Sequence, residues 1–279
     1  MSLPVKHTVD PEAYSTLNTA DLRNSFLIDS LFQPDRAVLV SCEVDRAIVG
    51  GIMPMAKGLP LSGSKKDLGT DEFAERREIG VINVGGKGTV EAGGKSYTLE
   101  HEDALYIGRG TRTIQFASAD PSKPAAFYMI SYPAHTAFPT KLIRRDDADR
   151  VDLGTPAQAN SRTIRKYILP GKVESCQLVM GMTTLAEGSV WNTMPPHTHI
   201  RRSEVYLYYN LPPDGAVFHF MGTPSQTRHL VMRDRQAVIS PSWSIHMGVG
   251  SKSYSFVWAM GGENQEFDDM DAVPVKSIM

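Results

Sequence analysis

Cysteine is scarce in this sequence of 279 residues, which contains only Cys42 and Cys176. The two lie far apart and neither belongs to a CxxC pair, so a disulfide framework is excluded and a reducing compartment is expected. Apolar residues flank both cysteines, which favours small packing residues over nucleophiles.

Charge of one sign and long apolar runs are also missing. The net charge is −2, and the densest charge cluster, RRDDADR at 144–150, contains signs that cancel. Nothing in this pattern would attract a nucleic-acid backbone or an anionic membrane. No apolar run reaches the roughly 18 residues of a membrane span, and the first residues lack the apolar core of a signal peptide. We therefore expect a cytoplasmic protein with neither a nucleic-acid nor a membrane partner.

Helical periodicity is confined to the start of the chain. Apolar residues recur at helix-like intervals over 11–33, and Asp10-Pro11 is a plausible helix start. Short β-branched or aromatic runs follow, such as SEVYLYYNL and AVFHFMG, and Gly-Gly or Pro-Asp-Gly turn signals separate many of them. This pattern predicts an all-β fold, either a sandwich or a barrel, preceded by a short helical segment.

The two halves of the chain resemble each other. The segment ending at Thr113 aligns with the one ending at His246, and upstream Glu78 aligns with Glu204. A repeat of this length predicts a duplicated domain, although the match is short and chance similarity is the alternative. We expect barrels at 1–150 and 151–279, joined by the polar stretch 144–161. The first should hold no metal, because no HxH pair precedes Glu78 and Thr113 replaces the last histidine.

The most informative segment is NTMPPHTHIRRSEVYLYY, at 192–209. Side chains two apart in a strand share a face, so His197 and His199 can reach one metal ion. Glu204 has the wrong parity for an unbroken strand, so a turn or bulge is expected between His199 and Glu204. His246, in SPSWSIHMGVG, offers a fourth ligand from a distant strand.

Chance alone predicts about 0.2 HxH pairs for 8 histidines in a chain of this length, so this pair by itself is weak evidence. The glutamate, the downstream Pro-x₄-His and the all-β context make coincidence much less plausible. Three imidazoles and one carboxylate suit zinc, manganese, iron or nickel. His219 and His229 lie in strands with many apolar neighbours, and structural roles are expected for both.

The spacing HxHx₄E…PxxxxH resembles the two signature motifs of the cupin superfamily, which is a double-stranded β-helix fold. At the matching positions, cupins bind metal. Glycine usually follows two residues after the proline of the second motif, and Trp243 occupies that position here.

A closer resemblance is carried by WNTMPPHTHIRRSEVYLYYN, AVISPSWSIHMGVG, GGENQEFDDMD, RREIGVINVGGKGTV and DALYIGRGTR. From about Leu22 to Val275, the chain is similar to the 5-keto-4-deoxyuronate isomerase family. The resemblance implies a cupin fold and a homohexamer with one Zn²⁺ per subunit. It also implies interconversion of 5-dehydro-4-deoxy-D-glucuronate and 3-deoxy-D-glycero-2,5-hexodiulosonate in pectin breakdown. The zinc ligands of the family match His197, His199, Glu204 and His246.

The chemistry also needs an acid–base group and a partner for the substrate carboxylate. Glu204 is expected to be essential for catalysis as the only anionic ligand. Glu263 and the carboxylates of Asp268–Asp271 are candidates for the base, although a solvated C-terminal segment would explain them equally well. A guanidinium or ammonium group should bind the uronate carboxylate. The candidates nearest the site in sequence are Arg162, Lys166, Arg201 and Arg202.

Three other functions remain open at this point. The closest is 5-deoxyglucuronate isomerase of inositol breakdown, which retains the reaction type and changes the substrate. An iron-dependent cupin dioxygenase is the second. The third is a cupin that binds a sugar acid without turnover, and the lack of a helix-turn-helix pattern argues against a transcription regulator.

Overall fold

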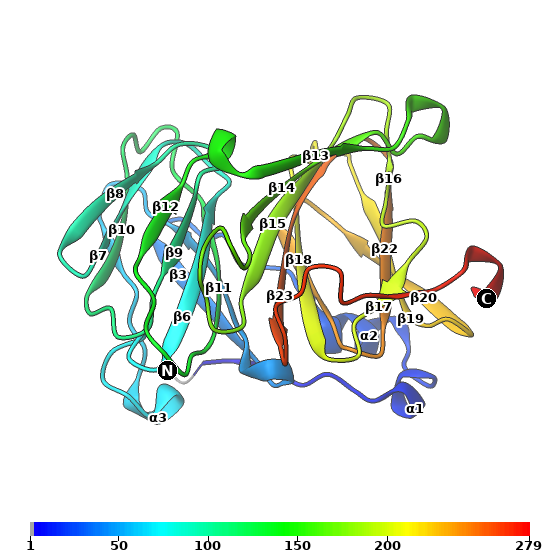
Figure 1. The fold of residues 1–279 in the computed structure, drawn as a ribbon, viewed down its shortest axis with the longest axis horizontal. Coiled ribbons are helices and arrows are strands. Elements are labelled where there is room, and N and C mark those ends of the chain that lie inside the picture. The colour runs from blue at the N-terminus through cyan, green and yellow to red at the C-terminus, as the bar shows by residue number, and fades with distance from the viewer. Residues whose placement is uncertain (1–2) are drawn as a thin grey trace. The chain divides into compact units, whose positions relative to one another are not determined.

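Antiparallel strands are the main regular structure of the computed structural model, which describes residues 3–279 (Figure 1). The all-β prediction is confirmed. Residue contacts divide the chain into two compact units. Unit 1 contains Ser30–Ala148 and Tyr167–Val179, together with the N-terminal residues as far as Val5. Unit 2 contains Lys6–Asp29, Asp149–Lys166 and Met180–Met279. Within the described residues, no helix is long and apolar enough to cross a membrane.

Unit 1 is built from two sheets around an apolar core. The seven-stranded sheet has the order β1-β3-β4-β11-β6-β9-β12, and the four-stranded sheet has the order β5-β10-β7-β8. Short helical turns connect some of these strands. The elements are β1 (Val5–Lys6), β3 (Arg36–Cys42), η1 (Val44–Arg46), β4 (Ile48–Met53), β5 (Leu59–Pro60), α3 (Lys65–Leu68), β6 (Arg77–Asn83), β7 (Gly88–Ala92), β8 (Lys95–Leu99), β9 (Ala104–Ile107), β10 (Ile114–Ser118), β11 (Phe127–Pro133), β12 (Lys141–Ile143) and η2 (Arg145–Asp147).

Unit 2 has one seven-stranded and one four-stranded sheet and a separate strand pair, β17-β24. The larger sheet has the order β13-β14-β15-β23-β18-β21-β2, and the smaller has the order β16-β22-β19-β20. The elements are α1 (Pro11–Tyr14), α2 (Thr19–Phe26), β2 (Leu27–Ile28), β13 (Asp149–Leu153), η3 (Pro156–Gln158), β14 (Arg162–Ile168), β15 (Val179–Leu185), β16 (Trp191–Asn192), β17 (His197–Thr198), β18 (Arg202–Tyr209), β19 (Val217–Thr223), β20 (Gln226–Met232), β21 (Gln236–Ser240), β22 (Ile245–Gly250), β23 (Ser255–Gly262), β24 (Asp271–Ala272) and η4 (Val275–Ser277).

Both units follow one strand plan. In each larger sheet the central order is the same, with β4, β11, β6 and β9 in one and β15, β23, β18 and β21 in the other. The smaller sheets also correspond, strand by strand. This agrees with the predicted duplication. The division into barrels at 1–150 and 151–279 stays a prediction, since the compact units also exchange two segments, Lys6–Asp29 and Tyr167–Val179.

The alignment of Glu78 with Glu204 needs correction. Ile79 and Val81 belong to the apolar core cluster of unit 1. Because successive side chains in a strand alternate between faces, Glu78 lies on the opposite face of β6 from this core. Its carboxylate accepts hydrogen bonds from the Tyr106 hydroxyl and from the backbone N–H groups of residues 176–178. Glu78 therefore has a structural role in holding that loop.

Two further local expectations differ from the structure. The helical segment predicted over 11–33 is two helices, because the Asn18 side chain caps a second start and Leu27–Ile28 pairs with β21 instead. The predicted start is confirmed, with the Asp10 carboxylate accepting from the N–H groups of residues 12 and 13. The polar stretch 144–161 is also not simply a linker, since β13 within it pairs with β14.

Trp243 explains the departure from the usual cupin glycine. Its ring packs edge-on against Tyr14 and Phe26, with centroid separations of 5.3 and 6.4 Å. The Tyr14 hydroxyl donates to the carbonyl oxygen of Met221 in β19. The indole therefore holds the two N-terminal helices against the rest of unit 2, and the turn from Pro241 still forms through the Ser244 N–H.

Candidate metal centre

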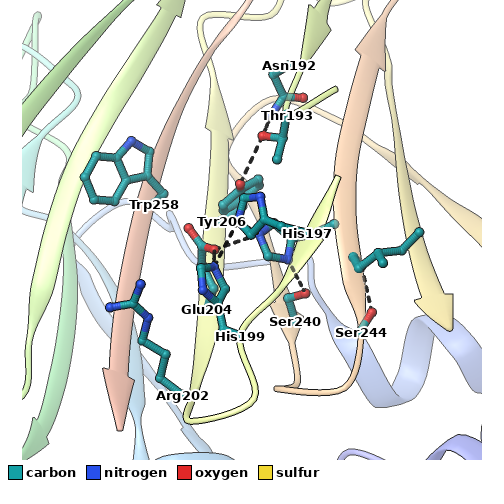
Figure 2. Close-up of polar contacts among 12 residues, drawn as sticks. Asn192, Thr193, His197, His199, Arg202, Glu204, Tyr206, Ser240, Ser244 and Trp258 are labelled. Atoms are coloured by element: carbon teal, nitrogen blue, oxygen red, sulfur yellow. Dashed lines mark hydrogen bonds and ion pairs between the residues drawn. The ribbon is translucent and has the colours of Figure 1, made fainter. Parts of the chain in front are cut away.

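Three strands of unit 2 bring four side chains together. β17 supplies His197 and is followed directly by His199, β18 supplies Glu204, and β22 supplies His246 (Figure 2). A turn at residues 200–201 separates the first two strands, as the parity of Glu204 predicted. One ligand atom from each of the four residues lies within 4.8 Å of the others.

The ligand atoms are in direct contact. His197 Nε2 lies 3.1 Å from both His199 Nε2 and His246 Nε2. Glu204 Oε2 lies 2.9 Å from His199 Nε2 and 2.8 Å from His246 Nε2. His199, Glu204 and His246 are buried, and His197 is partly buried. Four polar atoms thus converge in a space that is mostly shielded from water.

The tautomer of His199 indicates whether the space between the four side chains suits a cation. A carbonyl oxygen only accepts hydrogen bonds, so His199 Nδ1 donates to Asp269 O at 2.9 Å. A neutral His199 therefore directs an Nε2 lone pair at the Glu204 carboxylate, which is unfavourable unless a cation lies between them. The atom separations of 2.8–3.1 Å suit neighbouring ligands bound at about 2.0–2.1 Å to one ion. These residues fit a divalent metal ion.

The pKa shifts indicate the charges of His197 and Glu204. Burial, and then the charge that a protonated His246 would carry, lower the pKa of His197 to about 2. Burial raises the pKa of Glu204, but the neighbouring His246 and His199 outweigh it, so the net pKa lies well below its usual range. At neutral pH, His197 is therefore a neutral imidazole and Glu204 a carboxylate, the forms in which both side chains bind metals.

The C-terminal segment holds one side of the site in place. The Arg202 guanidinium donates to the carbonyl oxygens of residues 266, 267 and 269, and the Arg201 side chain pairs with the Asp269 carboxylate. β24 then pairs with β17, in which His197 lies. These contacts place the Asp269 carbonyl against His199, so the orientation of that ligand depends on a segment about seventy residues further along the chain.

A cavity of about 290 Å³ opens beside the ligands. His197, His199 and Glu204 line it, and further polar groups come from Arg162, Thr183, Thr193 and Tyr206. Trp258, Phe267 and Met270 contribute to an apolar wall. A small polar molecule with one anionic group matches this combination.

Arg162 is the one candidate for the substrate carboxylate that lines this cavity. Its guanidinium donates to the Asn160 carbonyl, and within residues 3–279 no carboxylate forms an ion pair with it. Burial lowers its pKa from the usual value. An incompletely paired cation at a cavity wall is a suitable partner for an anionic ligand.

The structure does not bring Lys166, Arg201 or Arg202 to the cavity. Lys166 lies over the Phe267 ring and 3.7 Å from the Asp149 carboxylate, while the C-terminal segment engages both arginines. The base candidates Glu263, Asp268, Asp269 and Asp271 do not line the cavity either, and Arg201 and Asn264 already bind the Asp269 carboxylate. Proximity in sequence was misleading because the C-terminal segment binds these cations through different groups. Backbone carbonyls accept from Arg202, the Asp269 carboxylate pairs with Arg201, and Lys166 lies over the Phe267 ring.

The sequence pattern assigned no role to Tyr206, and it missed Thr193, Trp258 and Phe267. The alternation of β18 puts Tyr206 beside Glu204, and its hydroxyl lies 3.3 Å from Thr193 Oγ1. Trp258 donates from Nε1 to Thr183 Oγ1. The period of β23 could have identified Trp258, whereas no local signal identifies Phe267.

His219 and His229 stay outside the ligand cluster. His219 is fully buried, and its Nδ1 lies 2.8 Å from the Tyr208 hydroxyl. Burial lowers the pKa of His219 to about 3. His229 is exposed and its ring contacts Phe218 and Phe220. Both side chains have surroundings that suit structural roles.

Comparison with known proteins identifies relatives of the whole chain. The sequence profile of the KduI/IolB family matches residues 40–275. A 4-deoxy-L-threo-5-hexosulose-uronate ketol-isomerase from Escherichia coli is 52% identical over 277 residues, which are 99% of this chain and 100% of that protein. The chain belongs to the KduI/IolB family. The same enzyme from a second Escherichia coli strain is 51% identical over the same lengths.

Solved structures of distant proteins have a fold similar to that of this chain. An IolB-like protein from Salmonella typhimurium is 14% identical, with a TM-score of 0.73 over 89% of this chain and 96% of that chain. An oxalate decarboxylase from Lactobacillus farciminis is 10% identical, with a TM-score of 0.55 over 78% of each chain. At such identities the likeness concerns the fold alone, and it confirms the predicted cupin architecture.

The first prediction concerns metal retention. His199→Ala should lower the affinity for a divalent ion by at least about 10–100-fold, because the remaining ligands cannot replace the member fixed by Asp269. Metal content per chain after dialysis, measured by plasma mass spectrometry, checks this. His229→Ala is the matched control and should retain the metal of the wild type. Full occupancy in His199→Ala would contradict the assignment of this ligand.

The second prediction concerns acid stability. Because the folded-state pKa of His219 lies near 3 and its usual value is 6.5, its stabilising contribution is complete above pH 6.5 and lost as the pH falls. Between pH 7.5 and 5 this amounts to about 2 kcal/mol in the free energy of unfolding. Urea unfolding of metal-free protein should show His219→Gln losing less stability than the wild type over this interval. Exposed His229→Gln should follow the wild type, and equal losses in all three would refute the assignment.

Proposed function

We propose that this chain is a metal-dependent aldose–ketose isomerase that converts 5-dehydro-4-deoxy-D-glucuronate to 3-deoxy-D-glycero-2,5-hexodiulosonate. The observation that carries the proposal is the 52% identity, over 99% of the chain, to a 4-deoxy-L-threo-5-hexosulose-uronate ketol-isomerase. The site is compatible with it, since a ligand cluster for one ion and an incompletely paired guanidinium face the same cavity.

We assign His197, His199, Glu204 and His246 as the metal ligands. When bound, the ion supplies Lewis-acid polarisation of the substrate carbonyl. The sequence motifs shared with the 5-keto-4-deoxyuronate isomerases support Zn²⁺ as this ion, with one per subunit of a cytoplasmic homohexamer. Elemental analysis of the purified protein and light scattering after size-exclusion chromatography test the ion and the assembly independently of turnover.

The reaction requires two hydrogen movements. One hydrogen moves from the hydroxyl-bearing carbon to the aldehyde carbon, and another moves from the hydroxyl oxygen to the carbonyl oxygen. The residues of the chain bind and orient the substrate for these movements. Arg162 binds the carboxylate at one wall, and the apolar wall at Trp258 and Phe267 restricts water around the reacting carbons.

The main rival is isomerisation of 5-deoxyglucuronate, because the family profile covers both groups of enzymes. The structural likeness to an IolB-like protein at 14% identity gives no support for that substrate. A cupin that binds the sugar acid without turnover is the second rival. The substrates themselves distinguish these three functions.

The third prediction tests the activity. Incubation with each uronate, followed by NMR, should show conversion of the 4-deoxy-5-keto-uronate and little or none of 5-deoxyglucuronate. Glu204→Gln, reloaded with excess zinc, should lose at least about 10–100-fold in turnover, because it lacks the only anionic ligand. The metal-free forms should unfold at similar temperatures, since the amide has nearly the volume of the carboxylate. Preferred conversion of 5-deoxyglucuronate, or no conversion of either uronate, would reject the proposal.

The fourth prediction concerns recognition of the carboxylate. Arg162→Gln should raise KM by about 10–100-fold, because a hydrogen bond to a charged group contributes about 1.5–3 kcal/mol. Arg150→Gln is the control, since Arg150 is exposed and pairs only with Asp152 among the residues described. Steady-state kinetics should measure KM for both variants and for the wild type. An unchanged KM in Arg162→Gln would show that another group binds the carboxylate.

A further inference from the structure

A chain of side-chain hydrogen bonds leads to the cavity from the buried side of unit 2. The Tyr254 hydroxyl donates to Asn192 Oδ1 at 2.8 Å, and Asn192 Nδ2 donates to Thr193 Oγ1 at 3.2 Å. Thr193 Oγ1 lies 3.3 Å from the Tyr206 hydroxyl (Figure 2). Tyr254 and Asn192 are almost fully buried. Thr193 therefore links a fixed internal network to a tyrosine of the cavity wall.

The hydrogen bond from Asn192 leaves the Thr193 hydroxyl hydrogen able to point at Tyr206. An amide nitrogen only donates, so Thr193 Oγ1 accepts from Asn192. The Thr193 hydroxyl then has its own hydrogen available for the oxygen of Tyr206. In this arrangement Tyr206 accepts from Thr193, and its own hydrogen is left for a group in the cavity.

The position of Tyr206 indicates that the acceptor of its hydroxyl hydrogen is a molecule bound in the cavity. Tyr206 follows Glu204 by two residues in β18, so both side chains lie on one face of the strand. Its ring centroid lies 5.4 Å from that of His246, and it lines the same cavity as His197, His199 and Glu204. A molecule bound next to the ligand cluster therefore meets the Tyr206 hydroxyl.

The backbone of Thr193 carries strain that its side chain helps to explain. Its φ is +53°, in the left-handed region that β-branched residues rarely adopt. Glycine would occupy this conformation without the steric cost of a side chain. A threonine here gains nothing for the backbone, whereas its hydroxyl forms the only link between Asn192 and Tyr206 among the hydrogen bonds described above. Strain of this kind tends to persist at functional sites.

We propose that the Tyr206 hydroxyl donates a hydrogen bond to a reacting oxygen of the substrate, and that Thr193 is the residue that positions it. This inference rests on the proposed isomerase function. A donor that is held in place before reaction stabilises the charge that develops on oxygen without having to reorganise. Tyr206 contacts the substrate, while Thr193 acts only through Tyr206.

The kinetic experiment separates positioning from folding. Thr193→Gly removes the hydroxyl and also relieves the backbone, so it should melt no lower than wild type and keep its metal content. Its kcat should nevertheless fall about tenfold, with KM little changed. Thr193→Ser should retain kcat within a few-fold. Tyr206→Phe should lower kcat by about 10²–10³, the loss seen when one donor to a developing oxyanion is removed.

The matched control is Thr113→Gly in unit 1. Thr113 is also a threonine with positive φ, +48°, but it is exposed and lies outside this cavity. Its variant should melt no lower than wild type and keep full kcat. Unchanged kcat in Thr193→Gly would overturn the positioning role. So would a lower melting temperature that accounts for the loss, or failure of Thr193→Ser to restore activity.

A binding experiment tests the same link without turnover. The probe is glycolohydroxamate, a planar mimic of an enediolate, titrated calorimetrically into the metal-loaded protein. Thr193→Val and Tyr206→Phe should each weaken binding about tenfold, and the double variant should bind no worse than Tyr206→Phe alone. Additive losses, or no binding by wild type, would overturn the proposal. If wild type binds the probe with this coupling but converts no uronate, the isomerase function fails and the hydrogen-bond donor remains.

Discussion

Glu204 Oε2 lies between two imidazoles, 2.9 Å from His199 Nε2 and 2.8 Å from His246 Nε2, and this contact requires a definite sheet register. In β18, Glu204 is paired with Ser240 of β21 and with Met260 of β23. A slip by one residue would turn Glu204 to the other face of the sheet and separate it from both histidines. Ser240 also places its hydroxyl 3.2 Å from His246 Nδ1, so the same register orients a second ligand. The strand pairing of unit 2 is thus inseparable from the chemistry of its interior.

The C-terminal segment adds a constraint that the sheets alone do not supply. Arg202 is almost fully buried, and three backbone carbonyls between residues 266 and 269 accept from its guanidinium. This fixes the Asp269 carbonyl, which accepts from His199 Nδ1 and thereby leaves Nε2 as the ligand atom. The Arg202 guanidinium therefore helps to assemble the site and is not available to bind a substrate. Arg162, on a different strand, has no carboxylate partner among the described residues and is the proposed partner of the substrate carboxylate.

The spacing of the sequence was sufficient to predict which four side chains cluster, and insufficient to predict what surrounds them. Strand parity and the Pro-x₄-His motif brought His197, His199, Glu204 and His246 to one place, because both are local rules. Contacts between remote segments have no such local signal. The sequence did not indicate that Arg202 would bind C-terminal carbonyls, nor that Leu27–Ile28 would leave a helix to pair with β21. The Trp243 position shows the same limit, since only the folded chain reveals that the indole packs on Tyr14 and Phe26.

The two units have the same strand order but different interiors. Equivalent strand positions carry apolar side chains in unit 1 and polar side chains in unit 2. In unit 1, Ile79 pairs with Ile107 between β6 and β9, and both side chains belong to an apolar core cluster. In unit 2, the corresponding pair is Glu204 and Ser240, and the interior contains the ligand cluster and a cavity. Apolar burial contributes roughly 25 cal/mol per Å², so the interior of unit 1 stabilises its barrel directly. The interior of unit 2 lacks part of that stabilisation because it contains buried polar groups. A cation at the proposed site would contact all four of these side chains at once. For the proposed metal site, ion binding and the folding of unit 2 should therefore be coupled, whereas the interior of unit 1 is a cluster of apolar side chains.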